Sequence, residues 1–142
     1  MKFSQFYDVT VKDDNGADIN VSLRFTIASG LKLKKKYKEE SRTILVSAGR
    51  DDEKLVDVLT ECLNWSGNSN AIKNGEELLE RMIESSPNGF GSISRMQLIG
   101  EIGYVSGIFD EFERDCLFSG LEKGKEHMSA AASEEDGNEK NA

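Results

Sequence analysis

The sequence holds few of the residues that most often carry enzyme chemistry or covalent cross-links. It has one histidine, one proline and two cysteines in 142 residues. The single histidine, His127, leaves little basis for histidine-dependent catalysis or a zinc site. The two cysteines, Cys62 and Cys116, are too few for a disulfide framework and favour a reducing compartment.

Long hydrophobic runs are also missing. No apolar stretch approaches the ~20 residues that a membrane-spanning helix needs. The first eight residues lack the apolar core of a secretory signal, so we expect a cytoplasmic protein with no membrane partner. The length is typical of one domain, and we place a single globular domain at residues 1–128.

Basic residues are outnumbered, 18 against 26 acidic, which gives a net charge of −8. This balance favours solubility and disfavours non-specific binding to nucleic acid.

Period-two alternation of apolar residues predicts a β-hairpin within residues 1–27. A three-residue loop, Asp14–Gly16, places Val11 opposite Ile19 and Val9 opposite Val21, so that apolar residues share one face. A two-residue loop would pair apolar with polar residues. The longer loop needs a left-handed residue, which Gly16 supplies.

Residues 28–128 are predicted to be helical. The sequence therefore indicates an α+β fold, with the hairpin packed on a bundle of four or five short helices. Residues 129–142 carry four acidic residues against one lysine and no large apolar side chain, which predicts a disordered tail. The expected helices cover 29–40, 51–63, 74–86, 94–106 and 108–127, with 41–49 as an irregular link or a helix extension.

Two features of the later helices predict packing. Phe109, Phe112, Cys116 and Leu121 recur at helical spacing and are expected to face inward; Cys62 and Cys116 are both expected to be buried. Gly100, Gly103 and Gly107 fall on one broad helix face. They indicate either close approach of another element or a hinge or dimer seam.

Five lysines lie between Lys32 and Lys38, and Lys32, Lys35 and Lys36 are candidates for partner binding. The acidic balance favours a solvated helix face over a nucleic-acid patch. A docking face for an acidic protein is the intermediate interpretation.

Clusters of carboxylates begin at Asp51, Glu76 and Asp110. Paired carboxylates can bind magnesium or perform acid–base catalysis. Acidic residues at helix starts are expected from the helix dipole alone, so no metal, cofactor or catalytic residue is assigned.

The last predicted helix offers a second candidate surface. Phe118 lies nine residues beyond Phe109 and therefore on the opposite side of that helix. With Leu117 and Leu121 it forms an apolar group that predicts a docking patch.

The order of these parts resembles the tail assembly chaperones of long-tailed bacteriophages and prophages. The resemblance covers roughly residues 20–110, an N-terminal β segment followed by four stretches. These are Phe25–Ala28, Leu55–Leu63, Asn74–Ile83 and Glu101–Phe109, the last containing Ser106-Gly107 followed by apolar residues.

The resemblance implies a non-enzymatic protein of the host bacterial cytoplasm. It would bind the long helical tape measure protein and keep it soluble until tail tube subunits replace it. A longer form made by ribosomal frameshifting near the end of the chain is a further implication, and the hairpin edge permits a homo-oligomer. The alternative is a small phage or bacterial protein that uses the Lys32–Lys38 helix to bind nucleic acid or an acidic protein. A carboxylate-based metal enzyme is a second rival.

Overall fold

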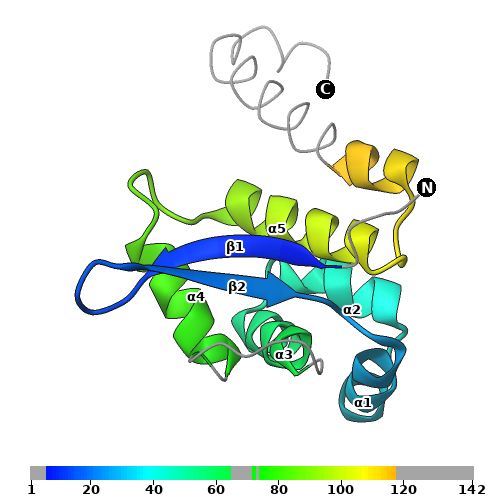
Figure 1. The fold of residues 1–142 in the computed structure, drawn as a ribbon. Helices are drawn as coiled ribbons and strands as arrows, with labels where there is room; N and C mark the ends of the chain where they lie inside the picture. The colour runs from blue at the N-terminus through cyan, green and yellow to red at the C-terminus, as the bar shows by residue number, and fades with distance from the viewer. Residues whose placement is uncertain (1–5, 65–71, 73, 118–142) are drawn as a thin grey trace, which may run out of the picture.

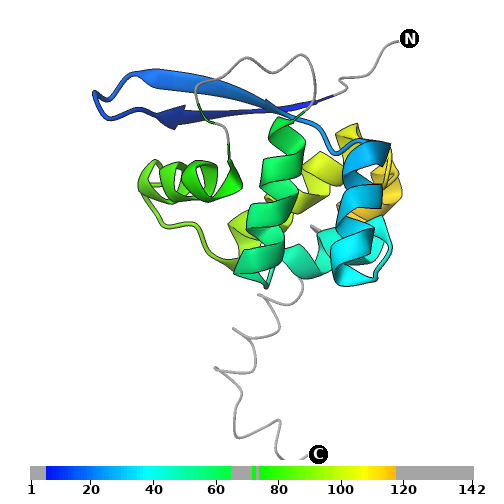
Figure 2. The ribbon, with the colours of Figure 1, turned by 90° about the horizontal axis from the view of Figure 1, so that it is seen from below.

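The computed structural model describes residues 6–64, 72 and 74–117. They form a two-stranded antiparallel hairpin and a larger set of helices, so the fold is mixed α+β and mostly helical, as predicted. The hairpin is a separate layer on one side of the helices (Figures 1 and 2). In chain order the elements are β1 (Tyr7–Lys12), β2 (Asp18–Leu23), α1 (Ile27–Tyr37), α2 (Ser41–Ala48), α3 (Asp52–Leu63), α4 (Gly75–Glu84), α5 (Ser92–Val105) and a further helical stretch at 111–117.

The register of the hairpin confirms the three-residue loop. Val11 pairs with Ile19 and Val9 with Val21. The Asp13 N–H donates to the Ala17 carbonyl at 2.8 Å, and the Gly16 N–H donates to the Asp13 carbonyl at 3.0 Å. Gly16 has φ 82°, the left-handed conformation that glycine adopts without steric cost.

The two faces of the hairpin differ in polarity. Val11, Val21 and Leu23 are buried against the helices. The opposite face carries three successive polar pairs across the strands: Lys12–Asp18, Thr10–Asn20 and Asp8–Ser22. The alternation that predicted the strands therefore also determines which face packs on the helical layer.

Side chains at the helix starts match the predicted caps. Asp51 accepts a hydrogen bond from the Lys54 N–H, and Asn74 accepts one from the Glu77 N–H. Each satisfies a backbone donor that the first turn leaves without a partner.

Residues 41–48 form a helix of their own, α2, where the sequence predicted a link or an extension. Lys38 causes the separation, because its φ of 61° ends α1 and turns the chain. The described residues consequently contain six helical segments, one more than the upper number expected.

The C-terminal end of α5 shows why glycine occurs at positions 103 and 107. The Gly107 N–H donates to the Tyr104 carbonyl and the Ile108 N–H to the Gly103 carbonyl, and Gly107 has φ 81°. This is a Schellman ending, so Gly107 lies beyond the helix and not on its face as predicted. A Cβ on Gly103 would lie 2.2 Å from the ring of Phe109, which is the predicted close approach.

A second close approach joins α3 to α4. A Cβ on Gly75 would lie 2.1 Å from the Val56 carbonyl oxygen. The Gly75 N–H donates to Thr60 Oγ1 at 2.7 Å, and the Thr60 hydroxyl donates to the Val56 carbonyl at 2.9 Å. Glycine at this position lets the start of α4 lie against the backbone of α3, close enough for its N–H to reach the Thr60 hydroxyl.

Buried apolar side chains from the hairpin and from α1 to α5 form one cluster. Cys62 belongs to this cluster, as predicted. Cys116 and Phe112 are exposed, so the expectation that these two side chains face inward was wrong. Residues 111–117 begin a new helix after the Gly107 turn, so Phe109 and Phe112 do not share one helical stripe. The boundary at 128, Leu121, His127 and the 129–142 tail lie outside the described residues. In the part of the chain that the structure covers, no helix is both long and apolar enough to cross a membrane.

Candidate functional site

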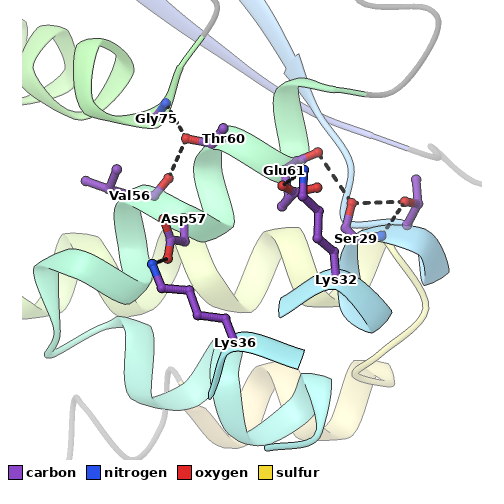
Figure 3. Close-up of polar contacts among 9 residues, drawn as sticks. Ser29, Lys32, Lys36, Val56, Asp57, Thr60, Glu61 and Gly75 are labelled. Atoms are coloured by element: carbon purple, nitrogen blue, oxygen red, sulfur yellow. Dashed lines mark hydrogen bonds and ion pairs between the residues drawn. The ribbon is translucent and has the colours of Figure 1, made fainter. Parts of the chain in front are cut away.

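The lysines of α1 face acidic side chains of α3. Lys32 Nζ lies 3.0 Å from Glu61 Oε2, and Lys36 Nζ lies 2.7 Å from Asp57 Oδ2 (Figure 3). Lys36 also contacts Glu53, and Lys34 contacts Glu40. Much of the positive charge of this helix is therefore balanced within the chain, which supports the solvated-face interpretation.

Glu61 is an unusual partner because it is buried, with 8% of its surface exposed. Its backbone carbonyl also accepts a hydrogen bond from Ser29 Oγ at 3.4 Å (Figure 3). A carboxylate in such a place needs a cation or hydrogen-bond donors. Lys32, a predicted partner-binding residue, thus has a structural contact of its own.

Asp57 organises the other end of α1. It accepts a hydrogen bond from the hydroxyl of Tyr37 as well as the ion pair from Lys36. Partial burial, and then the hydrogen bond to Asp57, raise the pKa of Tyr37 to about 12. The hydrogen bonds to Asp57 and Glu53 raise the pKa of Lys36.

Lys35, the third candidate lysine, is exposed on α1. Its side chain and that of Lys38 have no ion-pair partner among the described residues. The charges of Lys35 in α1 and of Lys38, which follows α1 directly, are therefore not neutralised by an ion pair with the described residues.

A second surface lies where α2 meets the 111–117 helix. Its apolar members are Val46, Phe109, Phe112, Cys116 and Leu117, which with Arg42 and Glu113 line a hollow of about 350 Å³. We call this hollow the Phe112 groove. Phe112 is 74% exposed, the highest fractional exposure of any aromatic residue in the described part of the chain.

Local hydrogen bonds fix the wall of the Phe112 groove. Asp110 Oδ1 accepts from the Glu113 N–H at 2.7 Å, and Glu113 Oε1 accepts from the Asp110 N–H at 3.0 Å. This reciprocal capping box starts the 111–117 helix. Arg42 from α2 pairs with Glu113 and donates to the Ile108 carbonyl at 3.1 Å. Asp110 and Glu113 thus have the structural role that the sequence favoured for them.

The groove continues along α2. A neighbouring hollow of about 550 Å³ shares Arg42 and Val46 with it and is lined further by Thr43, Ser47, Arg50 and Met96. Arg50 is exposed and has no ion-pair partner within the described residues. The apolar strip formed by Phe112, Val46 and Met96 therefore lies beside Arg50, while Arg42, which pairs with Glu113, lines both hollows.

Of the predicted docking patch, Leu117 lies in the Phe112 groove, whereas Phe118 and Leu121 lie outside the described residues. The sequence pointed to this region through Leu117 but assigned Phe112 to the core. An apolar pair on α1, Ile27 and Leu31, is also well exposed and was not predicted as a surface.

The carboxylates and the cysteine that the sequence offered for metal binding or catalysis have structural contacts instead. Asp52 pairs with Arg95, and Glu77 pairs with Arg81 at 3.3 Å. Across residues 6–64, 72 and 74–117, no three histidine, cysteine or acidic side chains are grouped to hold a metal ion. Burial raises the pKa of the Cys62 thiol, which makes it a poor nucleophile.

Comparisons of this chain with protein-family models, with curated proteins and with solved structures give no match. The physical character of the surfaces described above is therefore what bears on the function of the protein.

Proposed function

We propose that this protein is a non-enzymatic phage tail assembly chaperone that binds the tape measure protein. The observation that carries the proposal is the exposure of Phe112 beside an apolar groove that also contains Val46 and Leu117. A large aromatic side chain exposed next to other apolar groups is typical of a protein-binding site.

The shape and charge of the groove suit an amphipathic helix. Such a helix would place its apolar stripe on Val46 and Phe112, the mode of binding in which a groove accepts residues at helical spacing. Arg50 beside the apolar strip would favour acidic residues at the edge of that stripe. Burying Phe112 fully would stabilise the complex by about 2–3 kcal/mol before the entropy of association is counted.

This mode of binding fits the role that the sequence resemblance implies. A long helical chain exposes repeated apolar stripes before it is packed in the tail tube. A small acidic protein that covers those stripes through a shallow groove keeps the complex soluble, and tail tube subunits can later displace it.

The test is co-expression of this chain with the tape measure protein proposed as its partner. We expect that protein to remain soluble and to co-purify with the native chain, and expect Phe112→Asp to abolish both effects. Ile83→Asp is the matched control, because Ile83 is an exposed apolar residue on α4, away from the groove. Circular dichroism and the melting temperature check whether both variants fold before their binding is compared. If the Phe112→Asp variant bound the partner as well as the native chain does, the Phe112 groove would not be the binding site.

The alternative based on the lysine helix is disfavoured by the contacts of α1. Lys32, Lys34 and Lys36 are each within ion-pair distance of a carboxylate in the same chain. A salt-dependent gel shift of DNA at micromolar protein, lost in Lys35→Glu, would favour that alternative.

A further inference from the structure

The outer edge of β1 is open over part of its length. In an antiparallel pair, residues alternate between those bonded to the partner strand and those whose backbone groups point away. The bond from Asp13 N–H to the Ala17 carbonyl sets this alternation. Counting back from Asp13, the N–H and C=O groups of Lys12, Thr10 and Asp8 point away from β2.

The contacts of Lys12 agree with this count. Its N–H donates to Ser85 Oγ at 3.1 Å, and its carbonyl accepts from Arg81 Nη1 at 3.1 Å. Both partners come from α4 and its C-terminal turn, so they cover the edge at this end of β1. At Thr10 and Asp8, no described residue forms a hydrogen bond with the outward backbone groups.

Helix α5 lies in the helical layer beneath β1 and contacts it, and in the view of Figure 1 it extends beyond the β1 edge on the side away from β2 (Figures 1 and 2). Two hollows, of about 280 and 890 Å³, are lined by β1 and α5 and share Tyr7; the smaller one is also lined by Met82, Ser85 and Ser86 at the end of α4. On α5 they are lined by Ser94, Gln97, Glu101 and Tyr104, which follow helical spacing along one side. This stripe is about 15 Å long, the length of four to five residues of extended chain.

The charge of the larger hollow selects the kind of chain that fits there. Asp8, Glu101, Asp110 and Glu111 line it, with Arg114 as the single basic residue. Arg114 Nη1 lies 3.6 Å from Glu101 Oε1, and Arg114 Nη2 lies 3.8 Å from Glu111 Oε2. The guanidinium is therefore already paired with two carboxylates. An incoming chain is therefore favoured if it has lysine or arginine at this end.

We propose that the edge of β1 binds an extended basic segment of a partner protein as a third strand. Its backbone would pair with the free N–H and C=O groups of Thr10 and Asp8, and its inward side chains would enter the hollows above α5. Its basic end would lie against Asp8, Asp110 and Glu111. This site is separate from the Phe112 groove and does not depend on the function proposed for that groove.

The probe is a synthetic peptide of sequence Lys-Lys-Thr-Val-Thr-Val-Thr-Val, added to the full-length ¹⁵N-labelled protein. We expect the amide resonances of Asp8 and Thr10 to shift and hydrogen exchange at Thr10 to slow. The Asn20 amide, which faces the outer edge of β2, is the internal control and should not change. Replacing the two lysines by glutamates should weaken binding, and added salt should weaken binding of the basic peptide.

Thr10→Pro and Asn20→Pro are matched variants. Each removes an outward N–H and the same Thr10–Asn20 side-chain hydrogen bond, while the pairing of β1 with β2 is retained. Thr10→Pro should weaken peptide binding by about tenfold or more, and Asn20→Pro should leave it nearly unchanged.

Three results would overturn the proposal. One is the absence of shifts at Asp8 and Thr10 with millimolar peptide in the unmodified protein, a readout that does not require either variant to fold. Another is equal weakening by both proline variants. The third is concentration-dependent self-association that Thr10→Pro abolishes and the peptide does not, because a second copy of this chain would then be the occupant of the edge.

Discussion

Lys32 and Glu61 form an ion pair in which the ammonium is largely in solvent while the carboxylate is almost fully buried. The two residues belong to different helices, α1 and α3, so the pair holds the lysine helix against the core. Loss of the Lys32 ammonium would leave the buried Glu61 carboxylate without this cation, so the stability of the fold depends on a lysine at the surface.

Replacement of Lys32 by methionine should destabilise the protein by about 1–2 kcal/mol, because the buried carboxylate of Glu61 loses its cation. Urea denaturation measures this change. Lys35→Met removes the same charge from an exposed position on the same helix and should change the stability by less than about 0.5 kcal/mol. Equal effects of the two substitutions would show that the pair does not stabilise the fold.

Stability should fall between about pH 10 and pH 12 through Tyr37. Its pKa is raised from 10.0 to about 12 in the folded protein, so the unfolded chain loses this proton first as the pH rises. The stabilisation that Tyr37 contributes is fully present below the pKa of its hydroxyl in the unfolded chain. It is lost as the pH rises through the pKa of that hydroxyl in the folded protein. Tyr37→Phe should flatten this part of the pH–stability curve. Tyr7, whose pKa burial also raises, is present in both proteins and cancels in the comparison.

Substitution of Gly16 by valine should destabilise the hairpin by about 1–2 kcal/mol or more, because a β-branched residue is strained at a φ of 82°. Gly16→Asn should cost less, since asparagine tolerates the left-handed conformation. The melting temperatures of the two variants measure the difference. An unchanged value for Gly16→Val would contradict the loop geometry.

Replacement of Gly75 by alanine should destabilise the protein by about 2–3 kcal/mol. The new methyl group would meet the backbone of α3, which cannot rotate away as a side chain can. Gly91→Ala is the control: nothing lies within 4 Å of its Cβ position, so only the replacement of glycine at the N-cap of α5 is felt, at about 1 kcal/mol or less. Thermal unfolding of both variants distinguishes a packing effect from loss of glycine alone.

Cys116 should react with a thiol reagent in the native protein, whereas Cys62 should react only after unfolding, since Cys116 is exposed and Cys62 is buried. Because Cys116 lines the Phe112 groove, the bound partner should slow its labelling. The Cys116→Ser variant should show no fast-reacting thiol. Unchanged labelling in the complex would place the partner elsewhere on the protein.

Local patterns predicted much of the fold. The alternation around Asp13–Gly16 was sufficient for the strand register, and Asp51 and Asn74 marked helix starts, because each of these features depends on residues close in sequence.

The failures of prediction came from geometry that is not local. Nothing in a lysine indicates that Lys38 will adopt a left-handed conformation, so α2 was not separated from α1. The turn at Gly107 changes the helical phase, so extending the stripe from Phe109 placed Phe112 on the wrong side. Glu61 is buried, and the lysine that pairs with it comes from another helix, so neither fact could be read from neighbouring residues. The candidate groove was therefore located only in part, through Leu117.

Arg81 and Ser85 do more for β1 than anchor its last residue. By occupying the outward backbone groups of Lys12, they close one end of an edge that would otherwise be free along the whole strand. Exposed edges left open throughout can pair with further strands without limit and lead to fibrous aggregates. A closed end confines pairing to a short stretch, so this hairpin can remain at the protein surface without serving as a template for continuous sheet growth.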